Sequence, residues 1–482
     1  MVRVEKFLKE YIKAISEGYA AVFAGAGLSC ASGYVNWKEL LRPLAEEIEL
    51  DVDVEHDLIS IAQYYRNSKG RNQINQTILN NFTAEVKENE NINIITDLPI
   101  NTYWTTNYDT LIEDGVKRNN RKPDVKVTEK SLAINIYDRD AVIYKMHGDV
   151  SDPDSAILTK DDYDKYGLSH PLFRTVLRGD LVSKTFLFVG FSFEDPNLDY
   201  ILSSIKVLLD ESVRDHYCIL RRVNLQDYDD NDVGKQKFHY DSVKQGLRIS
   251  DLQRYGIQSV LIDDFDEITK ILLKIKSCCL LRNIFISGSV AEGYPVPGWS
   301  EADFNMFLSG LGRLLIEKDC KIVSGFGLGI GSPIVNGALE EIMSSRYKHL
   351  DEHLALRPFP QNVVGVEQRE EVRYQYREKM IEEVGIVIFI SGYKMDVDGN
   401  IKPAKGVMDE FEIAKQQCKY IVPIGSTDGV AKEILEEVKN DINRYLYLQN
   451  HLDILSDSTD AEVLKKTIFE IIDNIRKTEL GY

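Results

Sequence analysis

Short apolar runs alternate with longer helical patterns along the whole chain. This alternation is typical of parallel α/β architecture, because each strand is followed by a helix that crosses back over the sheet. In the first half, strands are expected at 19–26, 100–106, 142–146, 186–190, 216–220 and 257–262. The pattern restarts near residue 282, with strands expected at 282–289, 321–325, 356–359, 385–391 and 419–425. The sequence therefore predicts an α/β chain of two Rossmann-like parallel-sheet domains, residues 1–280 and 281–482.

A long helical insertion separates the first two expected strands. Its helical patterns are NWKELLRPLAEEI (36–48), DLISIAQYYRN (57–67) and INQTILNNF (74–82). Helical insertions into folds of this kind usually build a lid or a pocket wall, and that is the expectation here. The amphipathic segment VEKFLKEYIKAI (4–15) is expected to pack on its own domain, with a role in association as the alternative.

The charge balance and the cysteines exclude several classes of protein. Lys and Arg number 58 against 77 Asp and Glu, and the net charge of −19 disfavours non-specific binding to nucleic acid. The N-terminal residues lack a secretory signal, and no apolar run reaches the roughly 20 residues that span a bilayer. The 6 cysteines form no CxxC pair. We expect a cytoplasmic protein with reduced thiols that neither binds a metal nor contacts a membrane.

A glycine-rich turn follows the first expected strand, in the segment FAGAGLSCASG (23–33). Such glycines let a backbone turn tightly and approach a pyrophosphate, and a serine there can donate a hydroxyl. The groups expected at a ligand are those of Gly25, Ala26, Gly27 and Ser29. Cys30 stands where the dinucleotide fingerprint has its third glycine, so a tight turn without a ligand stays an alternative.

Polar residues follow three further expected strands. WTTNYDTLIE places Asn107 and Asp109 after one strand, and YKMHGD places His147 after the next. FVGFSFEDPNL adds Gly190 and Ser192. Because ligands bind at the carboxyl ends of parallel strands, we expect these residues to share one cleft. A histidine with a purely structural role is the alternative for His147.

These four segments, in this order, resemble the sirtuin fold over roughly residues 15–275. The resemblance implies binding and cleavage of NAD. Asn107 could then hold a ribose hydroxyl or water, and His147 could be the general base, since histidine titrates near about pH 6.5. Two departures disfavour protein deacylation: YVNW follows Ser32-Gly33 where deacylases have Pro-Asp-Phe-Arg, and the four zinc cysteines of the deacylases are absent.

Glycine turns also follow strands in the second half, at SGS (287–289) and SGFGLGIGS (324–332). Such turns expose backbone N–H groups, which are a natural seat for phosphate. Charged residues follow in the helical segment 367–384, which carries Arg373 and Arg377, although most of its charges suit a solvated face.

This half resembles the SLOG domain, a relative of the nucleotide-processing Lonely Guy family. GVMDEF (406–411) looks like that family's Gly-Thr-x-x-Glu segment, with Val407 replacing Thr. Because Ala404-Lys405 replaces the usual Gly-Gly, the resemblance implies binding of a nucleotide and disfavours its hydrolysis. The residues expected to bind an effector are Gly288, Ser289, Arg377 and Lys394 at its pyrophosphate and Glu410 at a ribose hydroxyl.

A sirtuin-like domain followed by SLOG resembles the NAD hydrolases of Thoeris antiphage defence over essentially the whole chain. The resemblance implies an inducible NAD+ glycohydrolase that produces ADP-ribose and nicotinamide. It also implies activation by a cyclic ADP-ribose isomer from a partner TIR-domain protein, and assembly as a cytoplasmic homotetramer. The alternatives are an NAD-dependent protein deacylase and a non-catalytic nucleotide-binding regulator.

Overall fold

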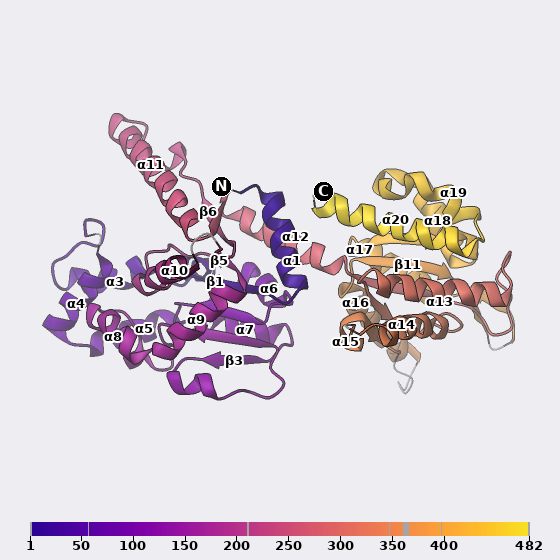
Figure 1. The fold of residues 1–482 in the computed structure, drawn as a ribbon, viewed down its shortest axis with the longest axis horizontal. Helices are drawn as coiled ribbons and strands as arrows, with labels where there is room; N and C mark the ends of the chain where they lie inside the picture. The colour runs from indigo at the N-terminus through magenta and orange to yellow at the C-terminus, as the bar shows by residue number, and fades with distance from the viewer. Residues whose placement is uncertain are drawn as a thin grey trace. The chain divides into compact units, whose positions relative to one another are not determined.

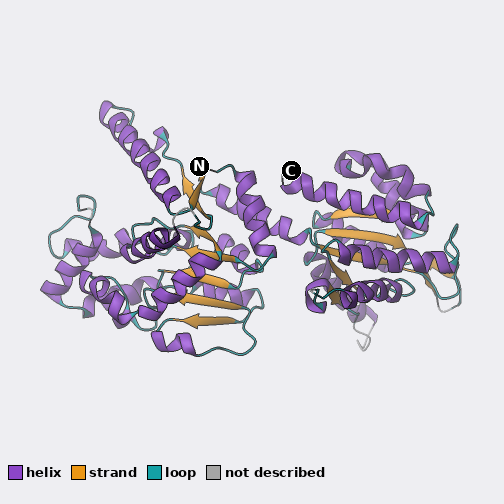
Figure 2. Ribbon diagram, viewed as in Figure 1, coloured by secondary structure: helices purple, strands orange, loops and turns teal. Residues whose placement is uncertain are grey.

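The computed structural model describes residues 2–55, 57–209, 212–346, 348–359, 366–396 and 398–480, with the side chains of 366–369 left out. The chain forms two compact units, Met1–Lys276 and Ser277–Tyr482. Each contains a parallel sheet with helices on its faces (Figures 1 and 2). The predicted fold class, a pair of Rossmann-like α/β domains, is confirmed.

The first unit is built on a sheet of seven strands in the order β3-β4-β2-β1-β5-β6-β7, all pairs parallel. The strands are β1 Ala20–Ala24, β2 Thr102–Thr105, β3 Pro123–Lys126, β4 Ala141–Lys145, β5 Thr185–Val189, β6 His216–Arg221 and β7 Ile257–Ile262. Strand β1 lies between β2 and β5, and all five of its residues are buried. All six predicted strands are present, and the edge strand β3 is additional.

The helices of the first unit are α1 Val4–Ser16, α2 Ala26–Cys30, α3 Trp37–Glu46, α4 Leu58–Lys69, α5 Asn72–Phe82, α6 Glu90–Asp97, α7 Leu111–Arg118, α8 Lys160–Ser169, α9 Pro171–Ser183, α10 Pro196–Leu209 and α11 Asp232–Arg254. Helix α12, Asp266–Leu280, begins in the first unit and ends in the second. The three helices predicted in the insertion are α3, α4 and α5, and the structure adds α6 before β2. Helix α1 packs on its own unit, as expected, because the Tyr11 hydroxyl donates to the Ala21 carbonyl and Phe7 contacts Tyr217. Helix α11 extends away from the sheet (Figure 1).

The second unit has a five-stranded parallel sheet in the order β10-β9-β8-β11-β14, and β12 and β13 form a separate antiparallel pair. Its strands are β8 Asn283–Ser289, β9 Lys321–Ser324, β10 Leu354–Leu356, β11 Ile386–Ser391, β12 Tyr393–Met395, β13 Ile401–Pro403 and β14 Tyr420–Ile424. Its helices are α13 Glu301–Glu317, α14 Gly331–Ser344, α15 Leu350–His353, α16 Val366–Glu382, α17 Lys405–Gln416, α18 Val430–Asn440, α19 Leu452–Asp457 and α20 Ala461–Leu480. The strand predicted at 356–359 was misplaced. It ends at Leu356, since Pro358 lacks the N–H that a ladder needs.

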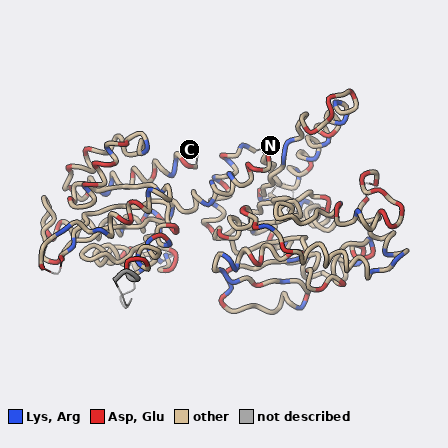
Figure 3. The backbone as a smooth tube through the Cα atoms, turned by 180° about the vertical axis from the view of Figure 1, so that it is seen from behind, with Lys and Arg blue, Asp and Glu red and all other residues tan. Residues whose placement is uncertain are grey.

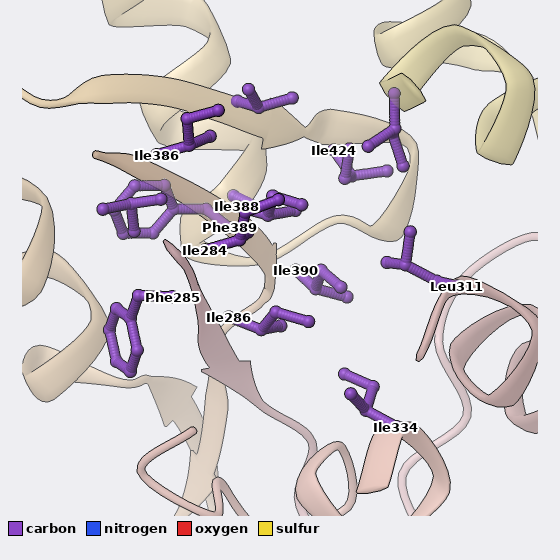
Figure 4. Packing of buried hydrophobic residues seen from close by; sticks show 14 of the residues in the cluster. Ile284, Phe285, Ile286, Leu311, Ile334, Ile386, Ile388, Phe389, Ile390 and Ile424 are labelled. Carbon is purple, nitrogen blue, oxygen red and sulfur yellow. The ribbon is translucent and has the colours of Figure 1, made fainter. Parts of the chain in front are cut away.

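The core of the second unit is apolar on both faces of its sheet, and every residue of β11 is buried. Ile286 on β8 and Ile388 and Ile390 on β11 are at most 5% exposed. Leu311 of α13 and Ile334 of α14 lie against the sheet (Figure 4). Burial on both faces explains why these strands read as continuous apolar runs in the sequence.

Acidic and basic residues are interspersed along the backbone of both units (Figure 3). In the described part of the chain, no helix combines the length and the apolar character needed to cross a membrane.

Candidate functional site

A large pocket opens at the carboxyl ends of β1, β2, β4 and β5 in the first unit. Its volume is about 920 Å³, at the upper end of the roughly 300–1,000 Å³ typical of ligand pockets. The predicted residues that line it are Ala26, Gly27, Ser29, Asn107, Asp109, His147, Gly190 and Ser192. The insertion forms part of its wall, with Trp37 and Leu40 from α3, Leu58 from α4 and Phe82 from α5.

Two glycine-containing loops touch each other at the base of this pocket. The Gly25 N–H donates to the Val189 carbonyl at 3.0 Å, and the Gly27 N–H donates to the Gly190 carbonyl at 2.9 Å. A Cβ on Gly25 would lie 2.4 Å from the Gly190 oxygen, and Gly190 itself has a φ of +65°. Only glycine allows this approach, because side chains would collide with rigid backbone. Gly25, predicted to contact a ligand, is therefore not among the residues that line the pocket. It lets the two loops behind the pocket pack closely.

Asn107, Ser29 and Asp109 form one hydrogen-bonded chain. Asn107 Nδ2 donates to Ser29 Oγ at 2.9 Å and to the Gly25 carbonyl at 3.1 Å. Ser29 Oγ in turn donates to Asp109 Oδ2 at 2.8 Å, and Asp109 Oδ1 accepts from the Leu111 N–H at 3.0 Å. Burial raises the pKa of Asp109 despite these hydrogen bonds. The chain fixes the Asn107 amide, with its carbonyl oxygen left for a ligand.

A buried lysine supports the two loops that carry Asn107 and His147. Lys145 Nζ donates to the Tyr108 carbonyl at 3.1 Å and to the Asp109 carbonyl at 2.5 Å. It also pairs with Glu113 at 2.9 Å and with Asp149. Burial raises the pKa of Glu113, whereas the Lys145 charge outweighs burial at Asp149 and lowers its pKa.

His147 lies beside a carboxylate that the sequence analysis did not select. His147 is 5% exposed, and its Nε2 lies 3.0 Å from Asp195 Oδ2, close enough for an ion pair but without hydrogen-bond alignment. The Tyr163 hydroxyl donates to the same oxygen at 3.2 Å, and the Leu198 N–H donates to Oδ1 at 2.9 Å. Burial acts to raise the pKa of Asp195, but the charge of His147, together with the hydrogen bonds from Leu198 and Tyr163, outweighs burial and lowers this pKa. Asp195 therefore faces the imidazole as a carboxylate at neutral pH.

The second unit has its own pocket, of about 440 Å³. It is bordered by the turns after β8 and β9 and by α16 and α17. The five residues predicted to bind an effector all line it: Gly288, Ser289, Arg377, Lys394 and Glu410. Lys394 is exposed on β12, and Arg373 of α16 lines the same pocket.

Arg377 and Glu410 are paired in this pocket. Arg377 Nε donates to Glu410 Oε1 at 3.2 Å, and Ser287 Oγ donates to Glu410 Oε2 at 2.5 Å. The Arg377 guanidinium also lies 4.9 Å from the centre of the Phe359 ring. Glu410 is 6% exposed, and burial raises its pKa against the opposing effects of Ser287 and Arg377.

Each half of the chain matches the model of a known protein family. Residues 101–240 match the SIR2-like domain, and residues 267–475 match the Sir2- and TIR-associating SLOG family. NAD(+) hydrolase ThsA of Cytobacillus dafuensis is 45% identical over 444 residues, 92% of this chain and 89% of the relative. The ThsA of Bacillus cereus (strain MSX-D12) is 46% identical over 92% of this chain and 91% of its own length. The ThsA of Enterococcus faecium is 42% identical over 98% of both chains.

The chain belongs to the ThsA family of NAD(+) hydrolases.

Membership of the ThsA family confirms the predicted order of a sirtuin-like domain followed by SLOG. A more distant relative, Defense-associated sirtuin 2 of Bacillus subtilis, is 24% identical over 216 residues. Among the described residues, the six cysteines form no disulfide with one another, and no three His, Cys, Asp or Glu side chains form a cluster suited to a metal.

Sequence reasoning missed Asp195 and the aromatic wall that Trp37 and Tyr163 contribute to the pocket of this ThsA-family chain. The signal for Asp195 was present, since it follows β5 within the same FVGFSFEDPNL segment as Gly190 and Ser192. An acid that follows a strand end is as well placed to reach a ligand as His147 is.

Proposed function

We propose that this chain is an inducible NAD+ glycohydrolase, cleaving NAD+ in its first unit under the control of a nucleotide bound in its second. As a member of the ThsA family, it is an NAD+ hydrolase with a role in defence. The observation that carries the proposal is the convergence of Asn107 and His147 on one pocket of about 920 Å³.

The reaction breaks the bond between C1′ of the ribose and the nicotinamide nitrogen. Both electrons of this bond leave with nicotinamide, which departs neutral, and the ribose carbon becomes electron-poor. A water oxygen then bonds to C1′ and gives up a proton, so the products are ADP-ribose, nicotinamide and H⁺. Nicotinamide needs no proton to leave, and the protein therefore has to position the ribose and accept one proton from water.

The two polar residues at the strand ends suit these tasks. Asn107 Nδ2 is held by Ser29 and the Gly25 carbonyl, which directs the remaining amide oxygen to a ribose hydroxyl or to the attacking water. His147 accepts the water proton as general base. The glycine loops at Gly27 and Gly190 leave backbone close enough to contact the pyrophosphate.

We assign the second pocket to a cyclic ADP-ribose isomer made by a partner TIR-domain protein. Arg377 and Lys394 provide cations for the pyrophosphate, and Gly288 and Ser289 provide backbone donors. A phosphate that attracts Arg377 frees Glu410 Oε1, which then accepts a hydrogen bond from a ribose hydroxyl. The match to the Sir2- and TIR-associating SLOG family supports a TIR partner, and the assembly proposed is a homotetramer.

Control by a ligand is a physical requirement for an enzyme that empties the cellular NAD pool. To move an equilibrium from 1:99 to 99:1, the effector must favour the active state by roughly 5.5 kcal/mol. Charge-assisted hydrogen bonds contribute about 1.5–3 kcal/mol each, so about two to four that form fully only in the active state suffice.

The test is nicotinamide release from NAD+ by the purified full-length chain, with and without a panel of cyclic ADP-ribose isomers. We expect release that requires one isomer and needs no acyl-lysine peptide. Release that depends on an acyl-lysine peptide would make the chain a deacylase. No release with any isomer would make it a nucleotide-binding regulator.

A further inference from the structure

Asp195 is the one carboxylate that the described structure places at ion-pair distance from the His147 ring. It lies in the loop between β5 and α10, is 8% exposed and borders the pocket itself. Its Oδ2 is 3.0 Å from His147 Nε2 and also accepts from the Tyr163 hydroxyl. Both oxygens of the carboxylate are therefore fixed, one by the side chains of the pocket and one by the start of α10.

We propose that Asp195 is a positioning residue for NAD+ hydrolysis, which holds the His147 ring with Nε2 protonated and stabilises the imidazolium that forms when His147 takes the proton of water. This inference rests on the proposed role of His147 as base. It adds the group that sets the tautomer and the charge balance of that base.

The argument starts from the chemistry of the two groups. An ionised carboxylate only accepts hydrogen bonds, so a neutral imidazole beside it is favoured with its N–H on Nε2. The lone pair then lies on Nδ1, the ring nitrogen other than the one that lies 3.0 Å from Asp195. When Nδ1 receives the water proton, the ring becomes a cation next to a fixed anion. The same arrangement of a buried acid behind a histidine orients and stabilises the base in hydrolytic triads.

The other groups around the His147 ring cannot supply the negative charge that Asp195 supplies. Tyr163 and Tyr166 of α8 lie with ring centres 5.6 and 6.3 Å from that of His147. Burial raises the pKa of both phenols, so they are neutral at working pH. His170 is a further titratable neighbour, and burial lowers its pKa against the opposing charge of Glu129. Asp195 is thus the negative charge available to a protonated His147.

The structural role of Asp195 can be separated from this electrostatic role. Asp195 Oδ1 accepts from the Leu198 N–H at the first turn of α10, which is the hydrogen bond of a helix cap. Asparagine caps helices about as well as aspartate, whereas alanine costs about 0.5–2 kcal/mol there. Asp195→Asn therefore keeps the cap and removes the charge.

The experiment measures kcat and KM for NAD+ as a function of pH in the full-length chain, with the cyclic ADP-ribose isomer that activates it best. For Asp195→Asn we expect kcat to fall by about 100- to 10,000-fold with little change in KM. We also expect the acid limb of the profile to move about one to three units to lower pH, because the imidazolium has lost its counter-charge. The matched control is Asp199→Asn, one turn along α10 and exposed, which should behave like the wild type.

A double mutant decides whether Asp195 acts through His147. In a His147→Ala background, Asp195→Asn should cause no further loss, since residues that act as a unit are not additive. A wild-type profile for Asp195→Asn, or an equal further loss in the His147→Ala background, would overturn the proposal. Loss of activity in Asp195→Ala alone, with Asp195→Asn fully active, would reduce Asp195 to a helix cap and also overturn it.

Two outcomes keep this inference separate from the proposed function. If His147→Ala still cleaves NAD+, the base itself is wrong. If His147→Ala is inactive while Asp195→Asn is wild type, only the inference fails. Should Asp195→Asn not fold, Tyr163→Phe removes a hydrogen bond from the same carboxylate. A roughly tenfold lower kcat with a displaced acid limb would then support the proposal, and an unchanged profile would overturn it.

Discussion

Arg377 Nε donates to Glu410 Oε1 at 3.2 Å within the pocket of the second unit, while Ser287 holds the other carboxylate oxygen. The guanidinium is therefore already bound to an acid that belongs to the protein. A phosphate that enters the pocket has to compete with this carboxylate, and a bidentate guanidinium is suited to that exchange.

Arg377→Ala should give a folded chain that no longer binds the activating cyclic ADP-ribose isomer. Arg377→Lys should be nearly as defective, because an ammonium cannot bind phosphate bidentately. Isothermal titration of the isomer is the measurement, with Arg313→Ala as the control, since Arg313 pairs with Glu340 on the exposed surface of α13 and α14. Unchanged affinity in Arg377→Ala would place the effector site elsewhere.

Asn107→Ala and His147→Ala should each abolish NAD+ cleavage, by about 100- to 10,000-fold for the base. Neither residue belongs to the unit that contains the second pocket, so titration of the same isomer should give wild-type affinity. Nicotinamide release and isothermal titration on the same preparations separate the two effects. Near wild-type turnover in folded His147→Ala protein would exclude His147 as the base.

Gly25→Ala should lower thermal stability and NAD+ affinity together, because the new Cβ would meet the Gly190 backbone at 2.4 Å. Overpacking of this kind costs about 1–3 kcal/mol. Gly179→Ala in α9 is the matched control, since a Cβ there meets nothing within 4 Å and should stabilise the helix by about 0.5–1 kcal/mol. Thermal melts of both variants check the contrast, and equal effects would contradict the close contact of the two loops.

Lys145→Met should destabilise the first unit by about 3–5 kcal/mol at neutral pH, because it leaves Glu113 and Asp149 buried without their cation. The exposed Lys270→Met is the control.

The loss of unfolding free energy in Lys145→Met, relative to the wild type, should become smaller as the pH is lowered. In the wild type, Lys145 lowers the pKa of Asp149 despite burial, so this contribution is present above the unfolded carboxyl pKa of about 4 and is lost as pH falls below it. In the variant, unopposed burial raises both carboxyl pKa values, and stability is then lost as pH rises. Denaturant melts at several pH values measure the difference in unfolding free energy between the wild type and Lys145→Met. A difference that does not change with pH would contradict the charge argument.

The fold was largely predictable because apolar strands buried on both faces leave a clear signal. Strand β3 was missed for a physical reason. It begins with Pro123 and carries Asp124 and Lys126, each 2% exposed and paired at 2.9 Å. Because these two charged residues are paired, they can be buried in the sheet. In the sequence, however, charged residues and a proline are typical of a loop.

The candidate site was predictable only where residues follow strand ends. That rule selected Asn107 and His147, and the residues it selected in each unit line the pocket of that unit. It could not show that Arg377 binds Glu410, because that contact depends on the packing of α16 against α17. It equally could not show the 3.0 Å approach of Asp195 to His147, which depends on the path of an irregular loop.

The position of β1 has a consequence for how the chain is made. This strand pairs with β2 on one side and β5 on the other, yet β5 is encoded far downstream. At about 5–20 residues per second, synthesis from Ala24 to Val189 takes roughly ten to thirty seconds. During that interval a fully apolar strand is outside the ribosome without one of its partners. Expression of this enzyme should therefore depend on chaperones more than its final stability suggests, and slowing translation between β1 and β5 should increase aggregation.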